Sequence, residues 1–511
     1  MSTGTAWSVA LTGLVGQMVE VEAAIGGGLP RTVLVGLPDT ALYEARDRCK
    51  VAVASSGLSW PAQLVTINLS PASVPKHGSH HDLGIAMAVL SAAEAVPASA
   101  GARTVCFGEL GLDGRVRSVP GILPAMIAAH DAGFRRVIVP WEQVREACLI
   151  DDLAVIGVST LAELVAVLNG KGTPRALSQA REAVVEEPDA PQDLADVAGQ
   201  AAARFALEVA AAGRHHLYLH GPPGVGKTML AERLPGLLPP LSRAESLEVS
   251  ALHSLSGRAL TGLIERPPYA DPHHSSSPVS IIGGGTRVLR PGSMSLAHRG
   301  VLFLDEAPEF NPRVLESLRV PLESGALTVG RALGQAQFPA RFQLVMAANP
   351  CPCGRKDSRG AACTCTPNAI RRYQQRISGP ILDRIDIQQR LTPLSRAVLR
   401  QAGTGQAGAA ESTATVAERV AEARQRQRHR LAGSGWLTNG EVPGPYLRTH
   451  LPLPAGLEIL DTAVGRGLLS PRGVDKVLRV AWSIGDLAGA DVPGRDHVAT
   501  ALAMRHGEVA A

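Results

Sequence analysis

The sequence predicts an α/β protein with a parallel-sheet core, a helical C-terminal part and a separate domain in front of the core. From 193 to 400, apolar strands alternate with helical segments, a pattern that favours a mostly parallel sheet. A glycine-rich loop follows one of these strands and opens a helix. The pattern from 401 to 511 is a linker followed by helices. Because 511 residues exceed what one core holds, we expect roughly three domains.

The first 171 residues are expected to form one domain that mixes strands and helices. Its β-rich runs are "RTVLVGL", "QLVTINL", "RTVCFGEL" and "RRVIVP", and its helical stretches include "ALYEARDRCKVAVASSG" and "GILPAMIAAHDAG". The apolar segment from Leu83 is interrupted by Glu94 and ends before Pro97, which is too short to span a membrane. We therefore expect a buried helix there. Residues 172–192 gain acidic residues and proline, which indicates a linker.

The core is expected over 193–400 and the linker and lid domain over 401–511. In the core, the helix "QAAARFALEVAAAG" leads to the strand "HHLYLHG", a loop and the helix "MLAERLPGLL". Further strands follow at "GVLFLDE" and "FQLVMAAN". After the stretch "AGTGQAGAAESTA", the lid begins with the charged helix "VAERVAEARQRQRHRLAG" and includes "SPRGVDKVLRVAWSIGDLAG".

The composition restricts the kinds of partner that the chain can bind. Its formal net charge of +4, with 19% charged and 45% hydrophobic residues, is ordinary for a water-soluble globular protein. Nucleic acid is permitted but not indicated, so binding would need a local basic patch or an oligomeric ring. Because only 3% of residues are aromatic, such contacts would reach phosphates rather than stack on bases. The N-terminus "MSTGTAWSVALTGL" lacks signal-peptide features, and we expect a cytoplasmic protein without a membrane partner.

The loop "GPPGVGKT" has the form of a phosphate-binding motif, G-x-x-x-x-G-K-[ST], between a strand and a helix. Glycines let backbone N–H groups surround a β-phosphate, and the helix that follows presents its positive end. Lys227 supplies charge toward the β- and γ-phosphates, and Thr228 offers a hydroxyl to Mg²⁺. The residues expected to hold ATP are Gly221, Pro222, Pro223, Gly224, Val225, Gly226, Lys227 and Thr228.

Two acidic residues end the apolar strand "GVLFLDE". Asp305 is expected to hold Mg²⁺ together with Thr228, and Glu306 to polarise an attacking water. Acidic residues at the end of a buried strand have few purely structural uses. The two motifs together predict a nucleoside triphosphatase, with hydrolysis favoured over mere binding because a general base is present.

Three further residues fit a ring-forming motor. Asn349 ends the next strand, where its amide is expected to orient the lytic water. Arg384 is the candidate for a cation donated to the γ-phosphate of a neighbouring subunit, and Arg472 for a cation that senses that phosphate from the helical lid. A surface ion pair is the alternative role for either arginine, but their order after the phosphate motifs favours catalysis.

Four segments carry a resemblance to one protein family: "GPPGVGKTMLAERLPGLLPPL", "SLAHRGVLFLDEAPEF", "MAANPCPCG" and "RRYQQRISGPILDRIDI". They resemble the AAA+ ATPases of the ComM/YifB family, which are similar to the ATPase subunit of magnesium chelatase. The resemblance covers 193–490 and implies an AAA+ P-loop core with a helical lid. It also implies that Asp193 to Gln200 border the nucleotide base, and that about 253–298 is an insertion projecting into a ring pore. His273 and His274 in that insertion are candidates to face DNA, with a turn-stabilising role as the alternative.

The first domain resembles the proteolytic domain of Lon-type proteases, an α+β (ribosomal S5-like) fold. "VPKHGSHHDLGIAMAVL" matches the segment that carries the serine of that family, and "GELGLDGRVRSVPGILPAMIAAHDAGFRRVIVP" the one that carries its lysine. A Ser-Lys dyad needs a hydroxyl beside an amine of lowered pKa. The match places Asp82 and Leu123 at those two positions, and neither has this chemistry. We therefore expect a scaffold for ring assembly or DNA contact rather than a protease.

Four of the seven cysteines fall within fifteen positions, as Cys351, Cys353, Cys363 and Cys365. Two such pairs on a short hairpin are expected to converge on a structural Zn²⁺, with four thiolates closing the shell. Disulfides are the alternative, but a cytosolic protein that uses ATP keeps its thiols reduced. The isolated Cys49, Cys106 and Cys148 are expected to be small core side chains.

The ComM resemblance implies a hexameric DNA motor that drives branch migration on single-stranded and branched DNA during recombination of incoming DNA. The basic run Arg424 to Arg430 is a candidate for further DNA contacts, with a solvated helix face as the alternative. A magnesium-chelatase-like or MoxR-like ATPase that remodels a protein partner is the alternative function. A protein that uses ATP only as a switch is disfavoured by Glu306 and Arg384 occurring together. The sequence indicates no particular protein partner.

Overall fold

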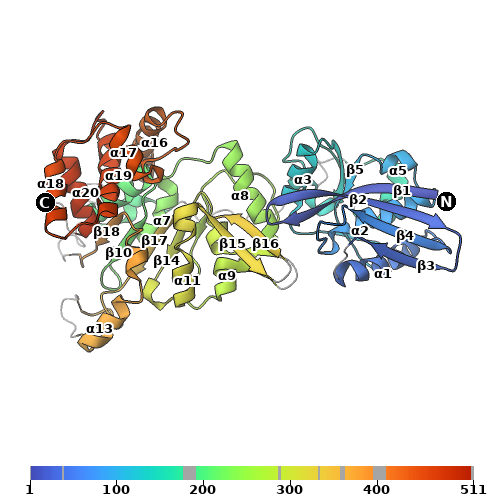
Figure 1. Ribbon diagram of the computed structural model, residues 1–511, viewed down its shortest axis with the longest axis horizontal. Helices are drawn as coiled ribbons and strands as arrows, with labels where there is room; N and C mark the ends of the chain where they lie inside the picture. The colour runs from blue at the N-terminus through green and yellow to red at the C-terminus, as the bar shows by residue number, and fades with distance from the viewer. Residues whose placement is uncertain are drawn as a thin grey trace.

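The computed structural model describes residues 2–36, 40–175, 192–285, 289–331, 334–356, 363–394 and 410–507. They form three parts along one long axis: the N-terminal domain at one end, the helical lid at the other, and the central sheet between them (Figure 1). The predicted linkers fall largely at 176–191 and 401–409, outside the described residues. Within the described ranges, none of the helices is long and apolar enough to span a bilayer.

The N-terminal domain is built on a seven-stranded mixed sheet in the order β3-β4-β2-β1-β5-β8-β9. Its strands are β1 (Ser2–Thr12), β2 (Val15–Gly26), β3 (Arg31–Val35), β4 (Leu64–Ser70), β5 (Thr104–Cys106), β8 (Arg136–Pro140) and β9 (Ala154–Val158). The β2 strand runs antiparallel to both β1 and β4, whereas the other neighbours are parallel. A small separate ladder joins β6 (Glu109–Leu110) to β7 (Val116–Arg117). The four predicted β-rich runs are confirmed as strands.

Helices cover both faces of this sheet. The helices are α1 (Thr40–Ser55), α2 (Asp82–Ala92), α3 (Ile122–Asp131), α4 (Val144–Ala147) and α5 (Leu161–Leu168). Side chains alternate between faces along a strand. In β5, Cys106 packs with α1, α2 and α5, whereas its neighbour Val105 packs with α3 and α4. The α2 helix is buried at every position, which confirms the buried helix predicted from Leu83.

The central domain contains a five-stranded, wholly parallel sheet in the order β11-β14-β17-β10-β18. Its strands are β10 (Leu217–His220), β11 (Tyr269–Ala270), β14 (Val301–Leu304), β17 (Gln343–Ala348) and β18 (Ile387–Arg390). In β17, Val345 packs with α6 (Ala201–Gly213), α7 (Lys227–Leu237) and the lid. The preceding Leu344 packs with α8 (Arg243–Ser256) and α11 (Pro312–Ser317) on the opposite face. Parallel pairing brings the carboxyl ends of β10, β14 and β17 to one edge, as predicted from the alternating pattern.

The segment 253–298 is not a single projecting insertion. It begins in the last turn of α8 and contains β11, which pairs with β14 as the edge strand of the sheet. Beyond β11 the chain forms α9 (Pro278–Ile282), a short ladder of β12 (Gly283–Gly284) with β13 (Arg290–Pro291), and α10 (Ser293–Leu296). The part that leaves the sheet is therefore the stretch between β11 and β14. Residues 286–288 within it lie outside the described residues.

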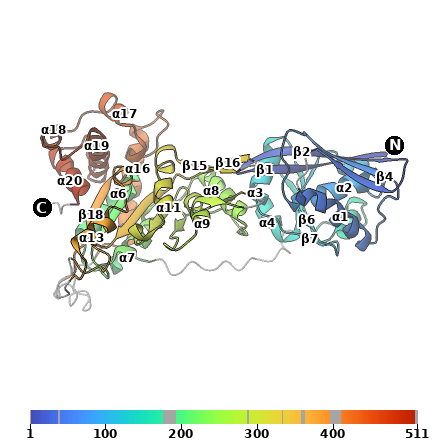
Figure 2. The same ribbon diagram turned by 60° about the horizontal axis from the view of Figure 1, so that its bottom comes forward.

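The N-terminal domain contacts the central domain in two regions, at a hairpin and along α8, where Asp151 also pairs with Arg243. The turn between β1 and β2 lies against the hairpin of β15 (Ala326–Arg331) and β16 (Gly334–Pro339), as Figures 1 and 2 both show. A Cβ at Gly13 would come within 3.0 Å of the Gln337 carbonyl oxygen, which favours glycine there together with its φ of +63°. At the second contact, the Leu123 amide donates to Ser254 Oγ of α8 at 3.1 Å. Beside it, burial raises the pKa of Glu146 to about 7.

The lid consists of α16 (Thr413–Arg430), α17 (Gly444–Thr449), α18 (Leu457–Gly465), α19 (Pro471–Leu487) and α20 (Arg495–His506). Most of the basic run on α16 is structural. Arg424 donates to the Ala211 carbonyl, and Arg430 pairs with the buried Asp486 at 2.7 Å while stacking over Trp482. Arg424 thus joins the lid to the core, and Arg430 joins α16 to α19 within the lid. Arg426, Arg428 and His429 are exposed, so a DNA contact there stays a prediction.

Candidate functional site: phosphate loop, arginine face and cysteine cluster

The phosphate loop follows β10 at the carboxyl edge of the sheet and leads directly into α7. Gly224 and Gly226 have φ of +77° and +94°, a region that side chains with a Cβ rarely adopt. No atom lies within 4 Å of a Cβ built on either glycine, so their conformation, not crowding, is what favours glycine. The loop thus has the backbone that surrounds a phosphate, and α7 starts at Lys227 with its positive end toward it.

Lys227 is 8% exposed and points along the loop. Its Nζ donates to the carbonyls of Gly221 and Pro222 at 2.8 and 3.0 Å, and to Asn349 Oδ1 at 3.0 Å. Burial lowers the pKa of Lys227, although Asp305 and Glu306 oppose that shift. The predicted cation and Asn349, 122 residues apart in the chain, are therefore in direct contact.

Thr228 and Asp305 lie together as a magnesium site requires. Thr228 Oγ donates to Asp305 Oδ2 at 2.9 Å, and the other carboxylate oxygen accepts the Glu306 amide at 2.8 Å. A hydroxyl beside a carboxylate is the donor set that Mg²⁺ takes next to phosphates. Glu306 itself is exposed and has a φ of +50°, which is rare for a residue with a side chain and typical of functional sites.

His274 contacts Glu306, the predicted general base. The sequence did not indicate this contact. His274 Nδ1 lies 3.7 Å from Glu306 Oε2, and its ring centroid lies 4.1 Å from that of His273 with the two planes tilted by 34°. His274 follows β11 and precedes α9, so the excursion between β11 and β14 begins beside the Glu306 carboxylate. The Ser275 amide donates to His273 Nδ1 at 3.3 Å, which fits the turn-stabilising alternative, and the DNA-facing role stays a prediction.

The segment Asp193 to Gln200 lies against the phosphate loop and the base of the lid. Gln200 Nε2 donates to the Val225 carbonyl at 3.2 Å and to the Thr392 carbonyl at 2.8 Å. Asp193 accepts the Thr413 amide from the start of α16 at 2.7 Å. The segment is thus held where it can border a nucleotide bound in the loop.

Arg384 and Arg472 line one cavity, of about 610 Å³, between the core and the lid. Arg384 follows α14 (Gly379–Leu382), pairs with Glu323 of α12 (Pro321–Ser324) and is 14% exposed, whereas Arg472 is exposed. None of the residues 221–228 is among those that line this cavity. Both predicted cations therefore belong to one face, which is separate from the phosphate loop of the same chain.

Lys476 fixes the position of the arginine face, the surface that carries Arg384 and Arg472. No sequence motif indicated this role. Lys476 Nζ donates to the Arg384 carbonyl at 2.8 Å and to Asp386 Oδ1 at 2.7 Å. Burial alone would raise the pKa of Asp386, but Lys476 together with His215 and His216 outweighs burial, and the pKa lies well below its usual value. This ion pair ties α19, which begins beside Arg472, to the turn that carries Arg384.

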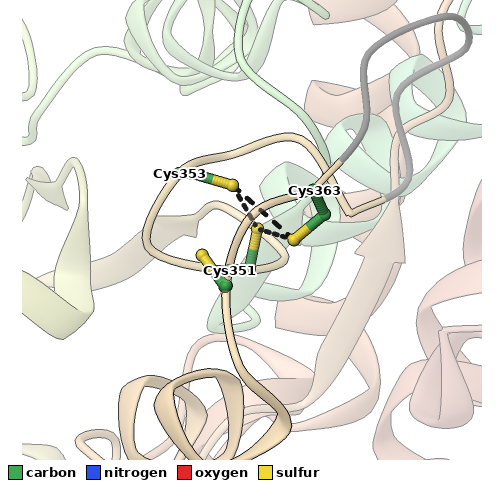
Figure 3. A group of neighbouring side chains, drawn as sticks. Cys351, Cys353 and Cys363 are labelled. Carbon is green, nitrogen blue, oxygen red and sulfur yellow. Dashed lines mark hydrogen bonds between the residues drawn. The ribbon is translucent and has the colours of Figure 1, made fainter.

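The four clustered cysteines converge. All four sulfurs lie within 4.8 Å of one another, and three of the distances are 3.4, 3.6 and 3.7 Å (Figure 3). Sulfurs bound about 2.3 Å from one tetrahedral ion lie about 3.8 Å apart, whereas a disulfide needs about 2.05 Å. The residues 357–362 between the two pairs lie outside the described residues.

The cysteine loop packs on the phosphate loop. A Cβ at Gly354 would come within 2.8 Å of the Pro223 ring, and Gly354 has a φ of +73°. α13 (Pro367–Gln374) follows the second cysteine pair and returns to the same place, since Gln374 Nε2 donates to the Pro350 carbonyl. Of the remaining cysteines, Cys49 and Cys106 are buried core side chains, and burial raises the pKa of Cys106 to about 12, whereas Cys148 is only partly buried.

The N-terminal domain lacks the chemistry of a Ser-Lys dyad at the matched positions. Asp82 is buried and binds Arg48 through both carboxylate oxygens, at 2.9 and 3.0 Å. Burial raises the pKa of Asp82 to about 6 even though Arg48 opposes that shift. Leu123 is a fully buried core residue. Both side chains are thus used for packing and charge pairing within the fold.

Comparison with known proteins identifies the same elements. The family model of magnesium chelatase subunit ChlI matches residues 193–399, a second ChlI model matches 21–143, and the model of its C-terminal region matches 410–505. The chain is 27% identical to Lon protease 2 of Sorangium cellulosum over 210 residues, which are 39% of this chain and 24% of that protein.

Several relatives match this chain over nearly its full length. A protein of Mycobacterium tuberculosis is 51% identical over 508 residues, 99% of both chains. YifB of Salmonella typhimurium is 40% identical over 99% of this chain and 97% of its own, and the competence protein ComM of Haemophilus influenzae 38% over 99% and 98%. The chain therefore belongs to the ComM/YifB family of magnesium-chelatase-like AAA+ ATPases.

Proposed function

We propose that this ATPase works as a cytoplasmic ring, most simply a hexamer, that translocates DNA and promotes branch migration during recombination of incoming DNA. The observation that best supports a ring is the separation of Arg384 and Arg472 from the phosphate loop of their own chain. A triphosphate in that loop has Lys227 as its near cation, and a second subunit would supply the other two.

The site has the parts that ATP hydrolysis needs. The loop amides and Lys227 would bind the phosphates, and Thr228 with Asp305 would hold Mg²⁺. When bound, the metal would neutralise charge on the phosphate oxygens. Glu306 is exposed at the same sheet edge, where its carboxylate can take a proton from an attacking water. Asn349, held by Lys227, would orient that water.

DNA is proposed as the substrate because the full-length similarity includes a competence protein. The magnesium-chelatase family models favour a second candidate, a chelatase-like or MoxR-like ATPase that remodels a protein. The deciding experiment measures the ATPase rate alone, with single-stranded DNA and with branched DNA, and then follows branch movement on three- and four-strand junctions. We expect branched DNA to raise the ATPase rate several-fold and the branch point of the junctions to move. A rate that no DNA changes would favour the protein-remodelling candidate.

We also propose that Cys351, Cys353, Cys363 and Cys365 hold one structural Zn²⁺. Four thiolates close a tetrahedral shell and leave no position for catalysis, so the ion would act by stiffening the loop. The stiffened loop matters for ATP because Gly354 abuts Pro223.

Replacing Cys353 by Ser is expected to lower bound zinc well below about one ion per chain, since three thiolates hold the ion more weakly. Nucleotide affinity and ATPase rate should fall several-fold because the support of Pro223 is lost, and ring assembly should weaken. Metal analysis and size-exclusion chromatography measure these effects. Cys148→Ser, at a part-buried cysteine outside the cluster, is the matched control. Unchanged zinc in Cys353→Ser would rule out this ligand.

A further inference from the structure

A second cavity, of about 510 Å³, lies at the edge of the central sheet opposite the phosphate loop. Its walls include Gly300, directly before β14, and Gln343, the first residue of β17. The phosphate loop follows the carboxyl end of β10, whereas these residues stand at the amino ends of parallel strands. Helix α16 of the lid and the segment from Leu238 to Ser242 complete the cavity, so it is bounded by both core and lid.

Positive charge is in excess in this cavity. Four arginines line it, against two carboxylates: Arg214, Arg299, Arg424 and Arg428 face Glu245 and Glu441. Arg214 pairs with Glu441, and Arg299 with Glu245 and with Glu248 outside the cavity wall. The two carboxylates are therefore already engaged.

The two α16 arginines that line the cavity, Arg424 and Arg428, have no carboxylate partner within the described residues. Arg424 donates from Nε and one terminal nitrogen to the Ala211 carbonyl, at 3.0 and 2.7 Å. Burial lowers the pKa of Arg424 to about 10, and the nearby Arg214 and Arg428 add to that shift. Arg428 is exposed. Among the arginines of the basic run, all within the described residues, Arg428 is the one that makes no hydrogen bond or ion pair.

Two buried polar groups in the wall also lack partners within the described part of the chain. Gln343 Nε2 donates to the carbonyls of Ala210 and His215, which fixes the amide and leaves Oε1 without a donor. Thr438 Oγ1 is likewise unpaired, and the two residues are 1% and 5% exposed. Unpaired buried polar atoms are uncommon in folded proteins because each costs free energy. The Thr438 hydroxyl can donate to a phosphate oxygen and is the second sign of such a ligand, whereas Gln343 Oε1 only accepts and would not contact a phosphate.

We propose that this cavity binds a small phosphorylated ligand through Arg424 and Arg428, separately from the ATP site. Guanidinium groups match phosphate oxygens in geometry and charge. The cavity has the size of small-molecule sites, and three of its four arginines are partly buried in the wall. Charge that faces into a cavity, rather than along an open groove, favours a small anion over a nucleic-acid strand. Because α16 and the sheet share the site, the ligand would brace the lid against the core.

The test uses the full-length Lys227→Ala chain, in which the phosphate loop has lost its ammonium group, and inorganic pyrophosphate without divalent metal as the probe. Isothermal titration should give saturable binding. Adding Arg428→Ala should weaken it about tenfold or more, the effect of losing one charge-assisted hydrogen bond. Arg428 is exposed and unpaired, so its removal should leave the melting temperature unchanged. Arg466→Ala, which removes the same charge from an exposed lid position outside the cavity, should bind pyrophosphate normally.

Three outcomes would overturn the proposal. Absence of saturable binding to the Lys227→Ala chain would mean that any pyrophosphate bound by the wild type occupies the phosphate loop. Equal weakening by Arg428→Ala and Arg466→Ala would show general surface attraction. Loss of affinity for a single-stranded oligonucleotide in Arg428→Ala, with no pyrophosphate binding, would assign the cavity to a nucleic-acid surface. None of these results depends on whether the ATPase moves DNA.

Discussion

Glu306→Gln should leave ATP binding intact and lower hydrolysis by about 10²–10⁴-fold, the usual contribution of a positioned general base. The amide keeps the size of the carboxylate but cannot take a proton from water. The side chain is exposed and its backbone amide is held by Asp305, so the substitution leaves the magnesium ligands in place. Nucleotide affinity from a fluorescent ATP analogue and single-turnover phosphate release measure the two effects separately.

Lys227→Ala is the matched comparison, because it removes the cation that contacts the phosphates. It should abolish nucleotide binding as well as hydrolysis, whereas Glu306→Gln should hold ATP uncleaved. If Glu306→Gln still turned over ATP at the wild-type rate, another group would have to be the base. His274 would then be examined first, since it is the titratable side chain 3.7 Å from the Glu306 carboxylate.

The phosphate motifs could be predicted from sequence because each is local. Gly221 to Thr228 and Asp305 with Glu306 are short runs at the ends of apolar strands, and parallel pairing of those strands brings them together whatever the loops between them do. The four cysteines were predictable for the same reason, since two closely spaced pairs in one hairpin have few ways to separate.

Contacts between distant segments could not be predicted in this way. His274 meets Glu306 only because β11 is the edge strand beside β14, and no pattern marks the two-residue β11. Lys476 meets Asp386 across 90 residues through the docking of α19. The place of Arg472 beside Arg384 follows from that docking too. Residue types and their order along the chain predict the chemistry of these groups, but not the face of the molecule on which they lie.

The hairpins β1–β2 and β15–β16 are not predicted from the sequence, although β1 and β2 carry a strand-like pattern. β1 and β2 alternate buried and exposed positions over much of their length, as strands with two different faces do. Small residues such as alanine and glycine weaken that alternation in the sequence. The β15–β16 hairpin pairs Leu327 with Phe338, and its role in contacting the β1–β2 turn is a property of the folded chain only.

Arg384→Ala should lower the ATPase rate of the assembled ring by about 10³–10⁵-fold, the range for a cation supplied to the transferring phosphate. Its side chain pairs with Glu323, which is 58% exposed and can be solvated after the change, so the fold should be kept. The substitution leaves the phosphate loop, Asp305 and Glu306 of the same chain untouched, and ATP affinity should change little.

Mixing two inactive variants distinguishes a cation given to a neighbour from one used within the chain. Arg384→Ala subunits keep Glu306, and Glu306→Gln subunits keep Arg384. In rings reassembled from equal amounts, roughly a quarter of the interfaces would place an intact site beside an intact arginine, because heterologous ring contacts join different faces of neighbouring subunits. ATPase activity should therefore return on mixing. If Arg384 served the site of its own chain, every site would lack one group, and the mixture would stay as inactive as its components. Recovery on mixing requires the arginine face and the phosphate loop to meet across a subunit boundary, which is what the cavity shared by Arg384 and Arg472 leads us to expect.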